Sequence, residues 1–241
     1  YHYGLGGWRG LVQAIDRRLQ WRRKAQPSGA MMEPTVRDRH AASDHPIHFA
    51  SDSRPTVSVV VPTYGQHDVT RRCLASLAAD MEGLAYEVVV IDDAFVEPVD
   101  ADSMHIAGLK LIRNENNLGF LRSCNRAVAA ASGDFVLLLN NDTVVHAGAI
   151  TSLLATYDQF ENVGAVCAQL RFEDGSLQEA GGIVWRDGSA WNWGRGEDPA
   201  DPRFCYPREV DYGSAAALMI RRSLWQDIGG FDEAFAPAYY E

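Results

Sequence analysis

The chain of 241 residues carries a formal net charge of −10, with 46% hydrophobic and 22% charged residues. This balance supplies a packed core and excludes an intrinsically disordered chain. Residues 1–54 hold nine basic and five acidic side chains, whereas residues 55–241 hold 13 and 27. The second segment, at −14, is unsuited to a nucleic-acid backbone. It suits an anionic ligand that a divalent cation bridges to the protein.

The chain contains four cysteines without metal-binding spacing: Cys73, Cys124, Cys167 and Cys205. Three of them lie among apolar residues, so we expect reduced thiols and a cytoplasmic protein. No stretch approaches the roughly 18 apolar residues of a membrane span, and no signal peptide is evident. Because the chain starts without Met and stops at Glu241 without a terminating signal, we expect it to be part of a longer protein.

Residues 1–54 are predicted to be a basic amphipathic helix followed by a linker. Apolar side chains from Trp8 to Leu19 follow helical spacing, and basic residues gather between Arg17 and Lys24. Two interpretations stay open: the helix packs on a neighbouring domain, or it lies on the inner face of the membrane. Residues 27–53 show no periodicity and are predicted to be a polar linker.

Residues 55–241 alternate between β-branched and amphipathic segments, which predicts βαβ units and a mostly parallel sheet flanked by helices. Strands are predicted at 57–61, 87–91, 109–112, 135–139, 163–169 and 215–220. Helices are predicted at 69–79, 120–131, 147–157 and 223–228. Residues 171–209 lack periodicity, and we expect a hairpin and loops laid over the sheet.

Polar residues cluster where three of the predicted strands end. The clusters are Pro62-Thr63-Tyr64, Asp92-Asp93 and Asn140-Asn141-Asp142. In open α/β sheets, ligands bind outside the carboxyl ends of the strands. The three clusters are therefore expected to converge on one crevice.

This crevice has to hold phosphates without a glycine-rich loop. Neither GxGxxG nor GxxxxGK(S/T) follows the first strand, which disfavours a dehydrogenase and a P-loop enzyme. The carboxylate of Asp142 can bind Mg²⁺ or Mn²⁺, which in turn binds a diphosphate, and Asn140 and Asn141 can add uncharged contacts. The alternative is a plain turn in which Asp142 or Thr143 caps the next helix.

Several segments, in order, resemble family 2 glycosyltransferases. They are VSVVVPTYG at 57–65, YEVVVIDDA at 86–94 and RNENNLGFLRSCNRAVAAASGDFVLLLNNDT at 113–143. LQEAGGIVWRDGSAWNWGRG at 177–196 and GGFDEAFAPAYYE at 229–241 resemble a subgroup found in bacterial surface-polysaccharide enzymes. The resemblance covers residue 55 to the end and implies a GT-A fold with a Rossmann-like sheet.

The resemblance also implies roles for the matching residues in binding the nucleotide. Pro62, Thr63 and Tyr64 would lie by the nucleoside. Asp92 would accept a hydrogen bond from a pyrimidine imide, supported by Asp93.

A second matching segment would close over the nucleoside through Asn117 and Gly119. Asn125 matches a family asparagine. The arginine expected before it is Cys124, and Arg122 is its expected substitute. All of these residues are predicted to bind the nucleotide.

Two departures from the family pattern concern the chemistry. Asn140 stands where the family's DxD motif begins with Asp, which leaves Asp142 as the implied metal ligand. The family places its general base in a Glu-Asp pair after the GGFD segment, where this chain supplies Glu241. Either Glu241 is the base, or the base lies in sequence that follows. Asp232 of GGFD is expected to contact the sugar or the acceptor.

Three tryptophans fall in the segment without periodicity: Trp185, Trp191 and Trp193. Sugars stack on tryptophan faces, so these side chains are candidates for lining an acceptor groove. The alternative is that they pack the loops onto the sheet.

The combined expectation is an inverting glycosyltransferase that moves a sugar from a UDP- or dTDP-sugar to a glycan or lipid-linked saccharide. A nucleotidyltransferase is a rival, but PTYGQHD lacks the expected basic glycine-rich loop. A non-catalytic nucleotide-sugar-binding or scaffolding module is the rival of a different class, favoured by Asn140.

Overall fold

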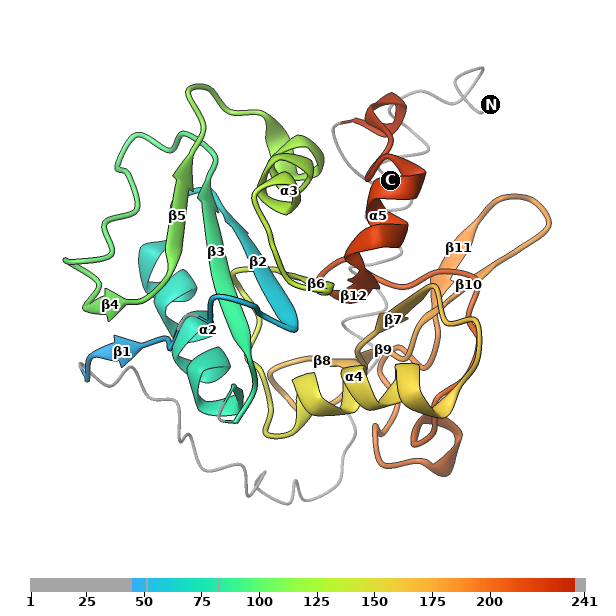
Figure 1. The fold of residues 1–241 in the computed structure, drawn as a ribbon. Helices are drawn as coiled ribbons and strands as arrows, with labels where there is room; N and C mark the ends of the chain where they lie inside the picture. Colours follow the sequence, from blue (N-terminus) through green and yellow to red (C-terminus); the bar gives the residue numbers. More distant parts are fainter. Residues whose placement is uncertain (1–44, 51, 82, 237–241) are drawn as a thin grey trace, which may run out of the picture. The chain divides into compact units, whose positions relative to one another are not determined.

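A six-stranded mixed sheet forms the centre of the computed structural model, which describes residues 45–50, 52–81 and 83–236 (Figure 1). Its strand order is β5-β3-β2-β6-β12-β7. The strands are β2 (Val57–Thr63), β3 (Tyr86–Asp92), β5 (Lys110–Arg113), β6 (Phe135–Leu139), β7 (Ala165–Cys167) and β12 (Ala217–Arg221). The predicted N-terminal helix and Glu241 lie outside the described residues.

The pairing of the strands confirms the predicted, mostly parallel α/β architecture. β2 pairs in parallel with β3 and β6, and β3 pairs in parallel with β5. β12 enters between β6 and β7 and runs antiparallel to both. The sequence predicted the strand at 215–220 but did not indicate its direction. Because β12 is antiparallel to both neighbours, the sheet is mixed: parallel from β5 to β6 and antiparallel from β6 to β7.

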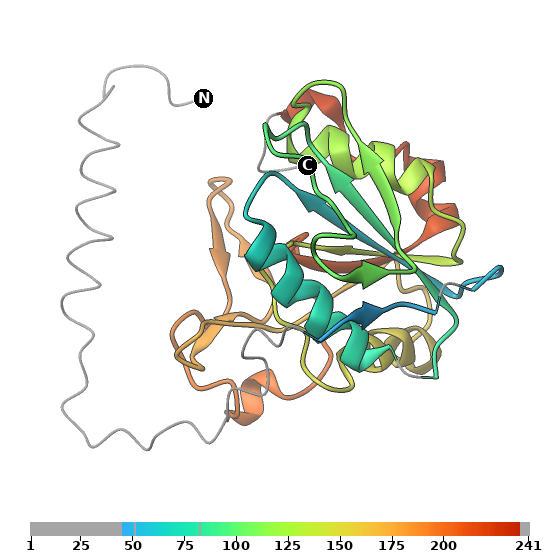
Figure 2. The same ribbon diagram turned by 90° about the vertical axis from the view of Figure 1, so that its left-hand side faces the viewer.

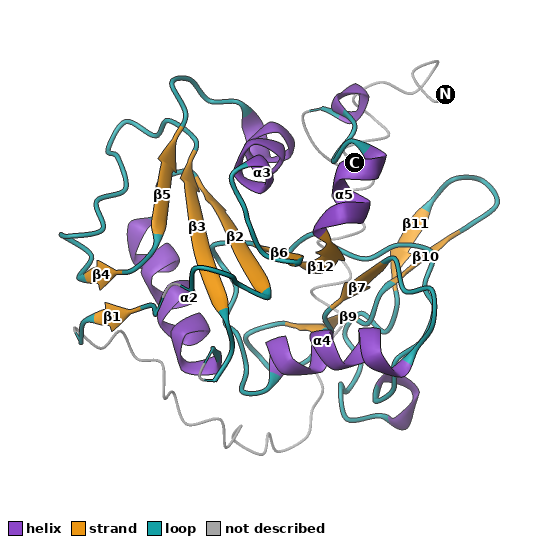
Figure 3. Ribbon diagram, in the orientation of Figure 1, coloured by secondary structure: helices purple, strands orange, loops and turns teal. Residues whose placement is uncertain are grey.

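Helices cover both faces of the sheet (Figure 3). α2 (His67–Asp80) and α4 (Ala149–Gln159) pack on one face, whereas α3 (Gly119–Ala129) and α5 (Arg222–Ile228) pack on the other. Among the described residues, no helix is both long and apolar enough to cross a membrane.

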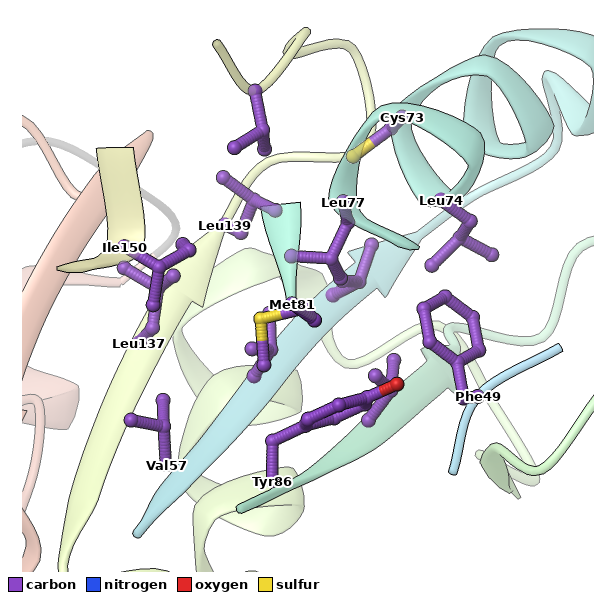
Figure 4. Packing of buried hydrophobic residues seen from close by; sticks show 14 of the residues in the cluster. Phe49, Val57, Cys73, Leu74, Leu77, Met81, Tyr86, Leu137, Leu139 and Ile150 are labelled. Atoms are coloured by element: carbon purple, nitrogen blue, oxygen red, sulfur yellow. The ribbon is translucent and has the colours of Figure 1, made fainter. Parts of the chain in front are cut away.

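Burial on both faces explains why the central strands β2, β3 and β6 appear in the sequence as largely hydrophobic runs. In β2, Val59 and Val61 belong to the cluster around Leu77 of α2, which Figure 4 shows from close by. Val60 points to the other face and joins the cluster around Trp225 of α5. Strict alternation between polar and apolar residues would leave one face without a core.

Part of the segment predicted as a linker belongs to the main domain. β1 (Ile47–His48) pairs in parallel with β4 (Ile106–Ala107). Phe49 is 1% exposed and meets Tyr86 edge-on, with ring centroids 6.2 Å apart. The expectation of a structureless linker is therefore wrong for residues 47–49, where the two apolar side chains are too few to show a period.

Residues 170–204 form the predicted hairpin and loops, with two hairpins instead of one. β8 (Leu170–Arg171) pairs with β9 (Leu177–Glu179), and β10 (Gly182–Val184) pairs with β11 (Ala190–Asn192). The 3-10 helix η1 (Pro202–Phe204) closes this segment, and a second, η2 (Glu233–Phe235), follows α5. Figure 2 shows the β10–β11 hairpin projecting on the side of the sheet at which β2 ends and α2 begins.

All four cysteines lie within the described ranges, and no disulfide joins them there. Burial raises the pKa of the Cys73 thiol to about 11, and Cys73 is fully buried, whereas Cys205 is exposed. Because the thiolate is the reactive form, we expect iodoacetamide at pH 8 to modify Cys205 first and Cys73 only after denaturation. Peptide mass spectrometry over time measures this order, and rapid native labelling of Cys73 would contradict the packing of α2.

Candidate active site

A cluster of hydrogen bonds joins the ends of β2 and β6, two of the three strand ends at which the sequence places polar clusters. The side-chain amide of Asn141 donates to the hydroxyl of Thr70 at 2.9 Å and to that of Thr63 at 3.3 Å. The two threonine hydroxyl oxygens lie 3.0 Å apart. Asn141 therefore ties the turn after β6 to the start of α2. Thr63 is 3% exposed, so its side chain serves this link.

An aromatic surface lies beside this cluster. Pro62 is buried, whereas Tyr64 is 52% exposed. The ring of Tyr64 meets that of Phe95 edge-on at 5.1 Å, and His67 approaches Phe95 at 6.4 Å. The exposed ring of Tyr64 and the half-buried ring of Phe95, at the ends of β2 and β3, offer a surface on which a nucleobase can stack. Sequence reasoning identified Tyr64 but missed Phe95, which follows the Asp pair in an unremarkable loop.

Asp92 is a buried carboxylate that organises the loop after β3. It is 1% exposed, forms an ion pair with Arg113, and accepts hydrogen bonds from the amides of Phe95 at 3.2 Å and Val99 at 3.1 Å. Arg113 also donates to the carbonyl oxygen of Phe95 at 2.8 Å. The predicted contact of Asp92 with a base stays a prediction, because these partners occupy much of the carboxylate.

Sequence reasoning also missed Arg113. The parallel register of β3 and β5 places Arg113 opposite Asp92. A basic residue directly after the third predicted strand was the available signal, but its value depends on a register that the sequence does not specify.

Asp93 anchors the loop that leads into α3. One of its oxygens accepts from the side-chain amide of Asn114 at 2.7 Å and from the amide of Leu118 at 2.8 Å. The other accepts from the amide of Gly119 at 2.8 Å. The same amide also donates to the side-chain oxygen of Asn117 at 3.0 Å. Gly119 has φ of 79°, a conformation that suits glycine. Asp93 thus fixes the loop that the resemblance places over the nucleoside.

Replacing Asp92 by Asn is expected to loosen the loop and weaken nucleotide binding. The amide keeps the shape but loses the charge that faces Arg113, and hydrogen bonds to a charged group contribute about 1.5–3 kcal/mol each. We expect a lower midpoint of urea unfolding together with a roughly ten-fold rise in the Kd for UDP or dTDP. Calorimetric titration and urea unfolding measure the two effects. Unchanged affinity and stability would contradict the anchoring role.

Asn140 presents an unsatisfied oxygen at the end of β6. Its main-chain amide donates to the carbonyl oxygen of Ala216 at 2.9 Å. Its side-chain oxygen is buried and has no hydrogen-bond partner in the part of the chain that the structure describes. Asp142, two residues on, is exposed. A buried polar oxygen without a partner fits a ligand or ion that satisfies it.

These groups fit a divalent cation held mainly by its substrate. Mg²⁺ is commonly bound by one or two protein carboxylates together with substrate phosphates. Within the described ranges, no three His, Cys, Asp or Glu side chains gather around one point. Asp142 and Asn140 therefore supply too few ligands for a cage of their own but enough for an ion that a diphosphate brings.

The alternative in which Asp142 or Thr143 caps a helix is wrong. α4 begins only at Ala149, with Gly148 as its N-cap. The carboxylate of Asp80 accepts hydrogen bonds from the amides of Gly148 and Ile150 there, the second at 2.9 Å. The turn after β6 is thus separate from the helix start.

The GGFD segment is pinned to α3. The side chain of Asn125 donates to the carbonyl oxygen of Phe231 and accepts from its amide, both at 2.9 Å. A Cβ at Gly230, where φ is 78°, would lie 2.6 Å from the Asn125 side chain, so this approach requires glycine. Arg122 forms an exposed ion pair with Glu233 at 3.0 Å. Asn125 and Arg122 thus hold the C-terminal segment in place.

Asp232 and the three tryptophans take different surroundings. Asp232 caps η2 by accepting from the amide of Ala234 at 2.9 Å. Trp185 and Trp191, on the β10–β11 hairpin, are 51% and 67% exposed and meet edge-on at 6.5 Å. Trp193 instead packs against Phe204 and under Arg208. Trp193 therefore fits the alternative in which the tryptophans pack the loops onto the sheet, whereas Trp185 and Trp191 remain exposed.

A mostly parallel sheet with helices on both faces and polar groups at the strand ends defines an α/β protein of the class that binds ligands beyond the carboxyl ends of its strands. The model of Glycosyl transferase family 2 matches residues 58–228. The chain belongs to this family. Membership agrees with the resemblance found in the sequence.

Two relatives of the chain are longer proteins. It is 27% identical over 197 residues to the O-antigen biosynthesis protein RfbC of Myxococcus xanthus, covering 78% of this chain and 16% of that protein. It is 30% identical over 194 residues to the pre-mycofactocin glycosyltransferase of Mycobacterium tuberculosis, covering 78% and 38%. The chain thus spans well under half the length of these two relatives.

Solved structures with lower similarity include a mannosyltransferase from Pyrobaculum calidifontis in complex with GDP-Man and Mn²⁺. It is 18% identical, with a TM-score of 0.49, and the match covers 92% of this chain and 55% of that one.

Proposed function

We propose that this chain transfers a sugar from a UDP- or dTDP-sugar to a hydroxyl group of a glycan or lipid-linked saccharide in bacterial surface-polysaccharide synthesis. The observation that carries the proposal is the junction of β2 and β6 through Asn141, Thr63 and Thr70. The Tyr64–Phe95 surface and the Asn140–Asp142 turn thus both lie at the carboxyl ends of the parallel strands. A nucleoside and its diphosphate need such neighbouring sites. Family membership supports the reaction class.

The side chains divide the work of a single displacement. Tyr64 and Phe95 bind the base, the loop fixed by Asp93 closes over the nucleoside, and Asp142 with Asn140 orients the diphosphate. A bound Mg²⁺ or Mn²⁺ supplies positive charge that offsets the charge developing on the leaving diphosphate.

The acceptor side completes the reaction. The acceptor oxygen bonds to the anomeric carbon as the bond from that carbon to the phosphate oxygen breaks, and Glu241 takes the hydroxyl proton. Attack from the face opposite the diphosphate inverts the configuration. Trp185 and Trp191 offer exposed faces to sugars of the acceptor, and Asp232 is a further candidate for contact with the sugar or the acceptor.

The rival proposal is a binding module without activity. It draws on Asn140, which leaves one fewer negative charge for a cation than the family's DxD motif. Both proposals require nucleotide-sugar binding, but only the first requires transfer.

The test begins with binding. UDP-, dTDP- and GDP-sugars with Mn²⁺ are screened for thermal stabilisation of the protein, since a ligand that binds the native state raises its apparent stability. The stabilising donor is then supplied with a radiolabelled sugar and a lipid-linked or soluble glycan acceptor. Transfer with inversion, seen by NMR, supports the enzyme; binding with neither transfer nor donor hydrolysis supports the module; no binding overturns both.

A further inference from the structure

Glu179 is a buried carboxylate that the proposed reaction leaves unused. Four acidic side chains of the described residues are buried: Glu87, Asp92, Asp93 and Glu179. Glu87 is held by Ser58 and Ser132 at the opposite edge of the sheet, and the two aspartates hold the nucleotide loops. Glu179 ends β9 at 2% exposure, and burial raises the pKa of its carboxyl. A charge that is costly to bury points to a specific role.

A series of hydrogen bonds links Glu179 to Asn140, the residue that stands where the family's DxD motif begins. Its carboxylate accepts from the amide of Ser214 at 3.0 Å. The Ser214 hydroxyl oxygen accepts from the amide of Ala216 at 3.2 Å, and the carbonyl oxygen of Ala216 accepts from the amide of Asn140 at 2.9 Å. The segment 214–216 therefore lies between Glu179 and the end of β6.

The same carboxylate stands at the base of the tryptophan hairpin. After Glu179 the chain passes through two residues into β10, and Gly182 of β10 pairs with Tyr212, two residues before Ser214. A Cβ at Gly182 would lie 2.0 Å from the Tyr212 ring, so the two segments are in close contact. Glu179 thus lies where the hairpin that carries Trp185 and Trp191 meets the segment that supports Asn140.

We propose that Glu179 is a positioning residue that fixes segment 214–216 against the end of β6 and so sets the geometry of Asn140 and Asp142. It acts through the main chain and does not contact the substrate. Its effect on donor binding rests on the proposed function; its effect on the order of the β6 turn does not.

Three substitutions separate this role from others. Glu179→Ala removes the acceptor of the Ser214 hydrogen bond. Glu179→Gln keeps an oxygen that accepts it and removes the charge. Asp174→Ala is the matched control, because Asp174 also accepts a main-chain hydrogen bond, from Ser176 at 2.9 Å, but lies in the exposed turn between β8 and β9.

The experiment compares hydrogen exchange, donor affinity and transfer rate in the full chain. For Glu179→Ala we expect faster exchange in peptides covering residues 140–143 and 214–216. We also expect roughly ten-fold weaker binding of the UDP- or dTDP-sugar with Mn²⁺, since small misplacements at a site are costly. For Glu179→Gln and Asp174→Ala we expect exchange, affinity and rate close to wild type.

Three other outcomes overturn the proposal. If hydrogen exchange at residues 140–143 is unchanged in Glu179→Ala, Glu179 does not influence Asn140 through segment 214–216. Faster exchange there with wild-type donor affinity removes the effect on the site. A Glu179→Gln variant that binds donor normally but loses transfer would mean a direct role for the charge. If the wild type binds no nucleotide sugar, the proposed function fails, while exchange still decides the structural link.

Discussion

Replacing Asp142 by Ala is expected to remove cation-dependent binding of UDP or dTDP and to lower the transfer rate by about 10²–10³-fold. Asp142 is exposed at the end of β6, beside the buried oxygen of Asn140 that lacks a partner among the described residues. Asn140 stands in place of the first Asp of the family motif, so Asp142 supplies the carboxylate of this turn. Replacing Asp142 by Ala therefore leaves the turn without a negative charge for a cation.

Calorimetric titration with Mn²⁺ and with EDTA measures the effect. Asp158→Ala is the matched control, because Asp158 is also an exposed aspartate but lies near the end of α4. It should bind nucleotide as the wild type does. Equal affinity of the wild type in Mn²⁺ and EDTA, and of Asp142→Ala in Mn²⁺, would remove the metal role.

Replacing Glu241 by Gln is expected to lower the transfer rate by about 10²–10⁴-fold while donor affinity stays at the wild-type value. The amide cannot take the proton of the acceptor hydroxyl, whereas the donor contacts of Tyr64 and Asp142 are unchanged. A large fall in kcat without a change in donor Kd distinguishes a base from a binding residue.

The control is Glu209→Gln, an exposed glutamate in the loop before β12. It should retain wild-type kcat. A Glu241→Gln variant that transfers at the wild-type rate would assign the proton to another residue.

Much of the fold follows from local pattern. The parallel strands were predictable because burial on both faces demands continuous β-branched and apolar runs, as in Val57–Thr63. The convergence at the strand ends followed from the parallel arrangement. The antiparallel direction of β12 was not predictable, since its residues would suit either direction and only its neighbours decide.

The candidate site was predictable only where one residue carries the chemistry alone. Asp142 and Tyr64 are exposed, and their type shows what they can bind. Arg113 and Glu179 act through partners 21 and 35 residues away. Such pairs depend on register and packing, which a single sequence does not encode at either position.

The antiparallel insertion of β12 also has a consequence for synthesis of the chain. Residues 140–216 separate β6 from β12, the strand that covers its outer side. At about 5–20 residues per second, a ribosome needs about 4–15 s to add them. During that interval β6, with the sequence FVLLL, is an apolar edge strand, the kind that pairs with other chains. Nascent chains of this protein therefore pass through an aggregation-prone stage that ends only when the strand before α5 leaves the exit tunnel.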